Sequence, residues 1–151
     1  MTVQSIIDSA VDTSRPKIDA GGHDLTVEMP GAPIWLDGDF TRLSQVVSNL
    51  LTNAAKYTPS EGRIQVSANR VADRVRIDVA DNGVGVPKEM QVRVFDLFTQ
   101  SKGPDDRSRE GLGIGLALVR ELVEMHEGAV ELESAGAGSG SRFTVWFPVV
   151  G

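Results

Sequence analysis

The sequence predicts an α/β fold of two layers, in which helices pack on one face of a mixed, mostly antiparallel β-sheet. Three observations lead to this prediction. Apolar residues recur with helical spacing in residues 3–14, 39–57 and 113–127. Six shorter segments have the alternation or composition of β-strands, residues 24–29, 34–36, 63–70, 74–80, 129–133 and 142–147. Helices and strands do not alternate one by one, as they would in a doubly wound parallel sheet.

The first helix is expected to end near Pro16 and the pair Gly21 and Gly22, because proline and glycine disfavour a helix interior. Two short strands follow, separated by a Pro-Gly turn. Either Asp37 or Asp39 can then cap the next helix by accepting a hydrogen bond from one of its first N–H groups.

The helix at 39–57 has two faces of different character. The apolar stripe that should face the core consists of Leu43, Val46, Val47, Leu50 and Ala54. Asn49, Asn53 and Lys56 fall within an arc of roughly 60° on another face, and Tyr57 follows at the helix end. Carboxamide oxygens for a metal ion, an ammonium group for phosphate and a ring for a base or sugar suit a nucleotide polyphosphate. A solvated polar face is the other interpretation, and the helix alone does not decide between them.

The segment 81–85 (DNGVG) follows a predicted strand. Asn-Gly favours a two-residue hairpin turn, but a hairpin needs a returning strand, and here Pro87 opens a helical stretch toward residues 95–98. In the other interpretation, the Asp81 carboxylate accepts a hydrogen bond from the exocyclic amine of adenine. The glycines at 83 and 85 would let the ring approach the backbone.

The segment 99–112 is polar, charged and contains glycine, which is typical of a mobile loop. The glycine-rich stretch 111–116 then leads into the helix at 113–127. It is either a flexible hinge or a phosphate site, because a helix start offers unpaired N–H groups and a positive dipole end. Arg107 and Arg109 lie in the loop, and they are either solvated or able to reach a γ-phosphate when the loop closes.

The composition excludes several classes of function. A net charge of −6 argues against a nucleic-acid surface, and the absence of cysteine excludes disulfides and thiolate metal sites. No apolar run approaches the roughly 20 residues of a membrane span. We therefore expect a soluble, cytoplasmic domain without membrane contact, which is compatible with a membrane-anchored parent protein. Neither of the common phosphate-binding signatures, GxxxxGK[ST] or GxGxxG after a strand, is present.

The two histidines are expected to be structural. His23 precedes an aspartate, as a phospho-accepting histidine can, but it follows two glycines and enters a strand, whereas such an acceptor should lie on a helix. His126 lies in the last turn of its helix, where the helix dipole favours positive charge.

Taken together and in order, four stretches resemble the motifs of the catalytic, ATP-binding domain of sensor histidine kinases. That domain belongs to the superfamily with the Bergerat fold, which includes DNA gyrase B, Hsp90 and the mismatch-repair ATPases. The N box, G1 box, F box and G2 box correspond to residues 49–57, 81–85, 95–98 and 111–116. The resemblance covers nearly the whole chain. The residues of its F box and G2 stretches are most similar to those of hybrid-type kinases, which carry receiver domains.

The resemblance implies a role for each matching position at the base end of the nucleotide. Asp81 would bind the adenine amine, with Gly83, Gly85 and Val86 against the ring. Thr144 would share the water between Asp81 and the base.

At the phosphate end, Asn53 would hold Mg²⁺ with the help of Asn49, Lys56 would contact phosphate, and Tyr57 would contact the base or ribose. The G2 stretch would line the phosphates beneath a mobile ATP lid at 99–112, and its residues are Gly111, Leu112, Gly113, Ile114, Gly115 and Leu116. The residues expected to take part in the transfer itself are Asn49, Lys56 and Arg109.

As a single domain over 1–151, the chain would bind Mg-ATP and donate the γ-phosphate to a histidine. That histidine lies on a separate helical hairpin domain, which passes the phosphate to a response-regulator receiver domain. Nothing before Leu25 supplies the hairpin, so we expect a domain of a longer protein that does not phosphorylate itself. Glu127 occupies a position where a second glycine is usual, and little effect is expected from it.

Three alternative functions are an ATP hydrolase, a serine kinase of the same fold, and a degenerate module that binds a partner and no nucleotide. The hydrolases of the superfamily place a glutamate one helical turn before the metal-binding asparagine, to activate water. This chain has Asn49 there, and a neutral carboxamide cannot act as that base. Fast hydrolysis is therefore disfavoured.

Overall fold

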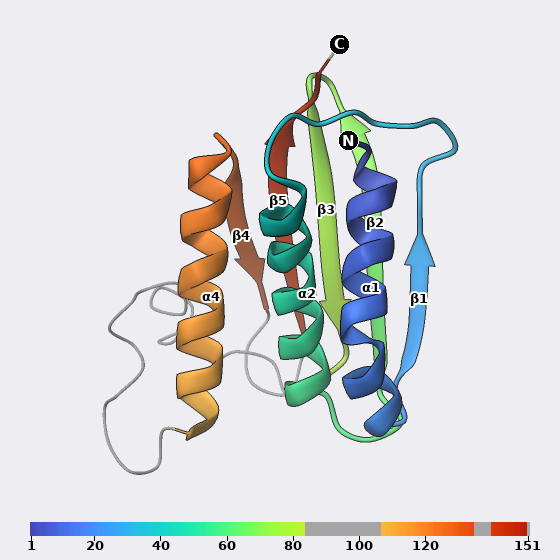
Figure 1. Ribbon diagram of the computed structural model, residues 1–151. Helices are drawn as coiled ribbons and strands as arrows, with labels where there is room; N and C mark the ends of the chain where they lie inside the picture. Colours follow the sequence, from blue (N-terminus) through green and yellow to red (C-terminus); the bar gives the residue numbers. More distant parts are fainter. Residues whose placement is uncertain (84–106, 135–139, 151) are drawn as a thin grey trace.

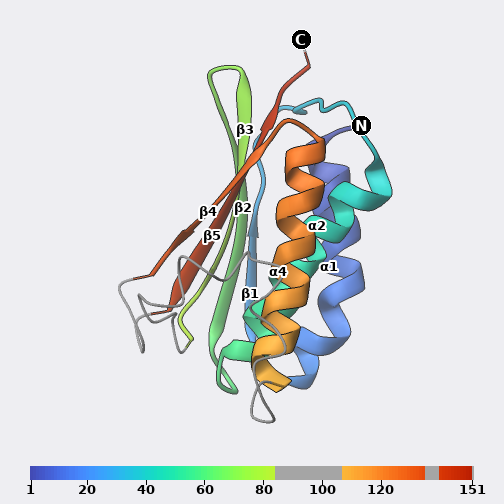
Figure 2. The same cartoon turned by 90° about the vertical axis from the view of Figure 1, so that its left-hand side faces the viewer.

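The computed structural model describes residues 1–83, 107–134 and 140–150, and only the backbone of residues 107–115. The described residues form two layers, with the helices on one face of a five-stranded sheet (Figures 1 and 2). The helices are α1 (Val3–Ala20), α2 (Phe40–Tyr57) and α4 (Arg107–Met125). The strands are β1 (Asp24–Glu28), β2 (Arg63–Val71), β3 (Arg74–Asp81), β4 (Ala129–Glu133) and β5 (Ser141–Pro148). The predicted fold class is confirmed.

The sheet has the strand order β1-β2-β3-β5-β4. Strands β1 and β2 are parallel, and α2 forms the crossover between them, while every other neighbouring pair is antiparallel. The sheet is therefore mixed and mostly antiparallel, as predicted. None of the helices in the described residues has the length and apolar character needed to span a bilayer.

The core lies between the sheet and α2, which is flanked by α1 and α4 (Figure 1). The predicted apolar stripe of α2 is buried along its whole length. On the sheet, alternate residues of β3 and β5 face this stripe, and they are Val75, Ile77, Val79, Phe143, Val145 and Phe147. Asp39 is the N-cap of α2, because its Oδ1 accepts a hydrogen bond from the Arg42 N–H at 3.1 Å.

The first helix does not end near residue 14, as its spacing predicted, because α1 continues through Pro16 and ends at Ala20, directly before Gly21. Ile18 extends the buried face beyond the predicted range, and Ser14 at its end is also fully buried. The Ser14 hydroxyl also donates a hydrogen bond to the carbonyl of Ser48 on α2 at 3.4 Å. Packing against α2 therefore outweighs the backbone hydrogen bond that proline cannot make.

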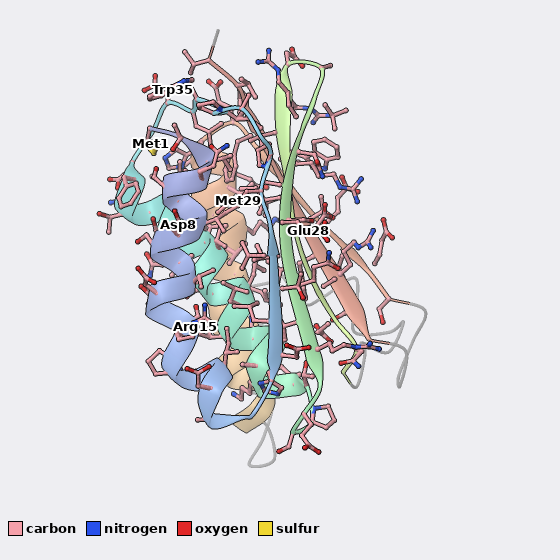
Figure 3. All side chains as sticks on the ribbon, turned by 90° about the vertical axis from the view of Figure 1, so that its right-hand side faces the viewer. Met1, Asp8, Arg15, Glu28, Met29 and Trp35 are labelled. Atoms are coloured by element: carbon pink, nitrogen blue, oxygen red, sulfur yellow. The ribbon has the colours of Figure 1, made fainter. Side chains whose placement is uncertain are left out.

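The predicted strand at 34–36 is also wrong, because this segment pairs with the chain start and not with the sheet. Trp35 forms an isolated bridge with Thr2, and the Val3 and Leu36 N–H groups donate to Ile34 O and Met1 O, both at 2.8 Å. Figure 3 shows Met1 and Trp35 at the same end of the molecule, beyond the helix layer. Trp35 is itself 54% exposed.

Helix α4 begins at Arg107 and ends at Met125, whereas the sequence predicted a loop to residue 112 and a helix at 113–127. Buried side chains in its second half anchor the helix, and elongation into the preceding residues is easy once a helix has formed. The predicted helix after Pro87, the F box at 95–98, residues 99–106 of the predicted lid and most of the last hairpin turn lie outside the described residues.

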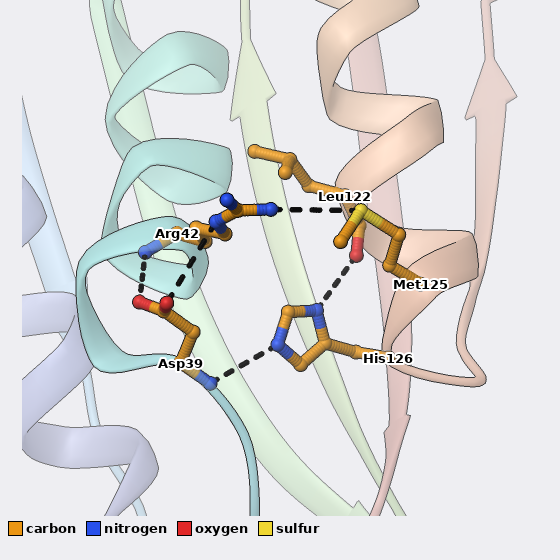
Figure 4. A network of polar contacts seen from close by, with 5 residues as sticks. All are labelled: Asp39, Arg42, Leu122, Met125 and His126. Atoms are coloured by element: carbon orange, nitrogen blue, oxygen red, sulfur yellow. Dashed lines mark hydrogen bonds and ion pairs between the residues drawn. The ribbon is translucent and has the colours of Figure 1, made fainter.

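His126 joins the end of α4 to the start of α2, so its predicted structural role agrees with its contacts (Figure 4). Its Nδ1 lies 2.8 Å from the Leu122 carbonyl, and its Nε2 accepts a hydrogen bond from the Asp39 N–H at 3.1 Å. Because Nε2 accepts in this arrangement, Nδ1 carries the ring proton and donates it to the Leu122 carbonyl. Beside it, Arg42 contacts both Asp39 and the Met125 sulfur.

Candidate functional site

The predicted site residues gather at one end of the molecule. The C-terminal ends of α2 and β3 and the N-terminal end of α4 lie together at the lower end of Figure 1. Direct backbone packing brings the first two together. A Cβ atom added to Gly83 would lie 2.4 Å from the Tyr57 carbonyl oxygen and 2.9 Å from the Thr58 hydroxyl oxygen. Only glycine fits at position 83, and the close approach joins the N box to the G1 box.

Asp81 is a partly buried carboxylate at the end of β3. Its Oδ1 accepts a hydrogen bond from the Gly83 N–H at 2.8 Å, and its Oδ2 accepts one from the Ser141 hydroxyl at 2.9 Å. Burial raises the pKa of Asp81 above the ordinary value, because removal from water disfavours the ionised form more strongly than these hydrogen bonds favour it. The carboxylate is therefore rigidly oriented and incompletely solvated.

The predicted role of Thr144 at the base-binding water is wrong. Thr144 pairs with Asp78 in the strand register and donates a hydrogen bond to its Oδ1 at 2.5 Å. Asp78 and Asp81 are three residues apart on one strand, so their side chains point to opposite faces of the sheet. Ser141 is the residue that pairs with Asp81 and contacts it.

The signal for Ser141 was present in the sequence. The apolar residues Phe143, Val145 and Phe147 alternate and must face the helices, so the side chain of Thr144 had to lie on the other face. Counting two residues back from Phe143 leads to Ser141.

A second glycine, Gly140, lets the backbone before β5 pack directly against Asp81. Gly140 has a φ of +72°, which favours glycine, and a Cβ atom there would lie 2.3 Å from the Asp81 carbonyl oxygen. Its N–H donates a hydrogen bond to the Gly83 carbonyl at 3.1 Å. The start of β5 and the G1 segment are therefore in direct contact.

Asn53 is one of three buried polar residues of α2, beside Ser44 and Ser48, and 8% of its surface is exposed. Its Nδ2 finds no hydrogen-bond partner within the described part of the chain. Asn49 lies one turn earlier and is partly buried, and the exposed Lys56 has its Nζ 5.5 Å from the centre of the Tyr57 ring. A buried amide without a partner is typical of a group reserved for a ligand.

Asn53 and Lys56 also line a cavity of about 480 Å³ between the ends of α1 and α2. Lys17 of α1 contributes to the same cavity, and sequence reasoning missed it because the helix was predicted to end before it. The described residues contain no cluster of three or more His, Asp or Glu side chains suited to a metal ion. A metal ion here would therefore depend on carboxamide oxygens and on oxygens of the ligand.

The G2 stretch lies inside α4 and not at its start. The N–H groups of the first four residues, 107–110, are the ones that a helix leaves unpaired, so the prediction of free N–H groups at 111–116 is wrong for this arrangement. Leu116 is fully buried in the core. The backbone of Arg109, Gly111, Leu112, Gly113, Ile114 and Gly115 lies in α4. Gly85 and Val86 lie outside the described residues.

The comparisons with known proteins agree on one family. A family model described as histidine kinase-, DNA gyrase B- and HSP90-like ATPase matches residues 38–151. The chain is 40% identical over 146 residues to the sensor protein DivL of Caulobacter vibrioides, which covers 97% of this chain and 18% of DivL. It is 42% identical over 122 residues to the sensor histidine kinase RcsC of Escherichia coli, which covers 81% of this chain and 13% of RcsC.

Solved structures give the same result. The mycobacterial sensor histidine kinase MprB superposes with a TM-score of 0.83 at 26% identity, over 99% of this chain and 97% of that chain. Full-length ShkA in complex with AMPPNP also superposes with a TM-score of 0.83 at 26% identity, over 99% of this chain and 30% of that chain.

The chain belongs to the family of histidine kinase-, DNA gyrase B- and HSP90-like ATPases. Within that family it is a catalytic domain of the histidine kinase type, as its resemblance predicted. It spans less than a fifth of the length of the curated relatives named above.

Proposed function

We propose that this chain binds ATP with Mg²⁺ and donates the γ-phosphate to a histidine on a separate helical hairpin domain. The observation that carries the proposal is the combination of an oriented carboxylate, Asp81, with a buried carboxamide, Asn53, whose Nδ2 has no hydrogen-bond partner among the described residues. The first suits the base of a nucleotide and the second suits its phosphates.

At the base end, Asp81 is an acceptor held by two hydrogen bonds, and the exocyclic amine of adenine is a donor. The guanine ring presents a carbonyl at the equivalent position, which would meet the carboxylate as a second acceptor. Asp81 therefore favours adenine, with Gly83, Gly85 and Val86 as the backbone that the ring approaches and Ser141 as a further polar contact.

At the phosphate end, Asn53, Asn49 and Lys56 are the proposed contacts, with Tyr57 at the base or ribose. Mg²⁺ would be held by the carboxamide oxygens of Asn53 and Asn49 and would neutralise phosphate charge. The Asn53 Nδ2 and the Lys56 ammonium are then donors for phosphate oxygens. We propose that the first half of α4 covers the phosphates. This part of the helix includes Arg109 and the glycines at 111, 113 and 115.

Transfer to a protein acceptor is favoured over hydrolysis for the reason that the sequence gives. Asn49 lies one turn before Asn53, and its neutral side chain cannot remove a proton from water. The names of two relatives support a kinase, since RcsC and MprB are sensor histidine kinases, and ShkA was solved in complex with the ATP analogue AMPPNP. A response-regulator receiver domain as the final acceptor and a cytoplasmic location belong to the same proposal.

The test is phosphotransfer between separated domains. The chain is incubated with Mg²⁺ and γ-labelled ATP, alone and with a separately purified hairpin domain that carries the histidine box. We expect label on the hairpin as phosphohistidine and none on this chain, and we expect Asp81→Asn to weaken the signal at limiting ATP. Label on this chain by itself, or release of inorganic phosphate as the main product with no labelled hairpin, would contradict the proposal.

A further inference from the structure

His23 lies at the turn between α1 and β1, beside the nucleotide site, and the proposed function gives it no role. Its Nε2 lies 2.7 Å from the carbonyl oxygen of Thr58, the residue that follows α2. A carbonyl oxygen only accepts hydrogen bonds, so Nε2 must carry the ring proton and donate it. The other nitrogen, Nδ1, is buried and has no partner among the described residues. With one nitrogen bonded and the other buried, the ring is not available as a phosphate acceptor.

The imidazole ring is wedged between two turns. A Cβ atom at Gly21 would lie 2.3 Å from the His23 Cε1, so the ring lies directly against the Gly21 backbone. The His23 N–H donates to the Ile18 carbonyl at 3.1 Å, and the Gly21 carbonyl accepts a hydrogen bond from the Glu61 N–H at 3.4 Å. The end of α1 therefore holds the ring in place against the segment that follows α2.

Thr58 connects His23 to the base site. It is only 5% exposed, and its hydroxyl oxygen would lie 2.9 Å from a Cβ atom at Gly83, as close as the Asp81 Oδ1. A shift of the Thr58 backbone would therefore move the groups at the end of α2 against which Gly83 and Asp81 are packed. The His23 hydrogen bond to the Thr58 carbonyl is a side-chain contact that opposes such a shift.

We infer that His23 is a positioning residue for the base of the nucleotide: its Nε2–H holds the Thr58 backbone, and through it the end of α2, against Gly83 and Asp81. The inference rests on the proposed function, because it assumes that adenine binds at Asp81. It assigns to His23 an effect on recognition of the base and no contact with the phosphates.

The test compares three variants of His23. In His23→Gln the amide nitrogen is as many bonds from Cα as Nε2, so it can still donate to Thr58. In His23→Asn the amide nitrogen matches the position of Nδ1 and cannot reach that carbonyl, and His23→Leu removes the donor altogether. Affinity for ADP and for adenosine is measured by calorimetry, well below the melting temperature of each variant.

We expect His23→Leu and His23→Asn to lower the affinity for ADP and the affinity for adenosine by the same factor. That factor is about tenfold, as for the loss of one well-placed hydrogen bond. His23→Gln should stay within about threefold of the unchanged chain. The matched control is His126→Leu, since His126 also bonds to backbone groups but joins the end of α4 to the start of α2. These two helix ends lie at the top of Figure 1, away from the candidate site. This substitution should lower the melting temperature and leave both affinities unchanged.

Two failures are distinguishable. If the unchanged chain binds neither ADP nor adenosine, the proposed function itself fails. If the unchanged chain binds and the Leu and Asn variants bind equally well, or lose affinity for ADP alone, the positioning role of His23 is overturned. If His23→Leu does not fold, equal affinities of the Gln and Asn variants overturn it instead.

Discussion

Asp81 is the residue on which the proposed function depends most. Burial of its ionised carboxylate lowers the stability of the folded chain. Loss of water raises the pKa of its carboxyl group in the folded chain, although Gly83 and Ser141 both donate hydrogen bonds to it. The folded chain therefore binds this proton more tightly than the unfolded chain does. Stability falls as the pH rises from the ordinary aspartate pKa of about 4 through the folded value, and the full penalty is present above both.

Asp81→Asn should separate stability from binding. At pH 7 the variant should be at least as stable as the unchanged chain in urea denaturation, because the penalty for the buried charge is gone. That advantage should disappear as the pH falls below about 4, where the carboxyl group becomes protonated in both states. Affinity for ADP should fall about tenfold or more, since a carboxamide can present a donor to the adenine amine.

Two outcomes would contradict this account of Asp81. One is unchanged affinity for ADP in calorimetry. The other is a variant that is less stable at pH 7 by an amount that does not depend on pH, because burial of the charge would then not govern the effect. Ser141→Thr, which keeps the hydroxyl group, is the control for the surroundings of Asp81.

The shared helix face of the proposed site residues on α2 could be predicted from spacing, whereas the partner of Asp81 was missed although the alternation in β5 points to it. The spacing of α2 predicted that Asn49, Asn53 and Lys56 share a face, because a helix is a local structure. The choice between Ser141 and Thr144 depends on strand register, which joins residues 60 positions apart. Register becomes predictable only when the buried side of both strands is identified.

At the scale of the elements, α2 was predicted nearly to the residue and its neighbours were not. Its cap at Asp39 and its apolar stripe are both visible in the sequence. The end of α1 was misplaced because Pro16 is a strong local signal, but the burial of Ile18 against the core is a tertiary effect. The start of α4 was misplaced because three glycines lower helix propensity locally, and propensity is a weak guide beside packing.

The end of α4 contains a residue in an unfavourable backbone conformation. Glu127 has a φ of +61° in the left-handed region, and the next residue, Gly128, donates its N–H to the Val123 carbonyl at 2.9 Å. Little effect is expected of this glutamate from the sequence alone, but a residue with a side chain costs about 1 kcal/mol or more in this conformation.

Glu127→Gly should therefore stabilise the domain by about 0.5–1 kcal/mol, because glycine adopts this conformation without the clash of a Cβ atom. Urea denaturation of the variant and the unchanged chain measures the difference, and ADP affinity should be the same for both. Glu127→Ala is the matched control, since it removes the charge and keeps the Cβ atom, and it should gain little. Equal stabilisation by both substitutions would show that charge and not backbone conformation is responsible.

At the scale of the whole molecule, the two ends of the helix layer have different tasks. At one end, His126 and Asp39 join α4 to α2 through hydrogen bonds far from the site (Figure 4). At the other end, the termini of α1, α2, β3 and β5 meet around Asp81, Asn53 and His23. The layered architecture could be predicted from periodicity, but the contact between His23 and Thr58 depends on how the turns around it pack.

The central claim is that adenine binds against Asp81, with its phosphates toward Asn53 and Lys56. A crystal of this chain soaked with Mg-ADP at saturating concentration tests it most directly. We predict electron density for the base with its exocyclic amine within hydrogen-bond distance of the Asp81 carboxylate, and for the phosphates beside α2. An empty cleft at saturation, or a nucleotide bound elsewhere on the domain, would contradict the account.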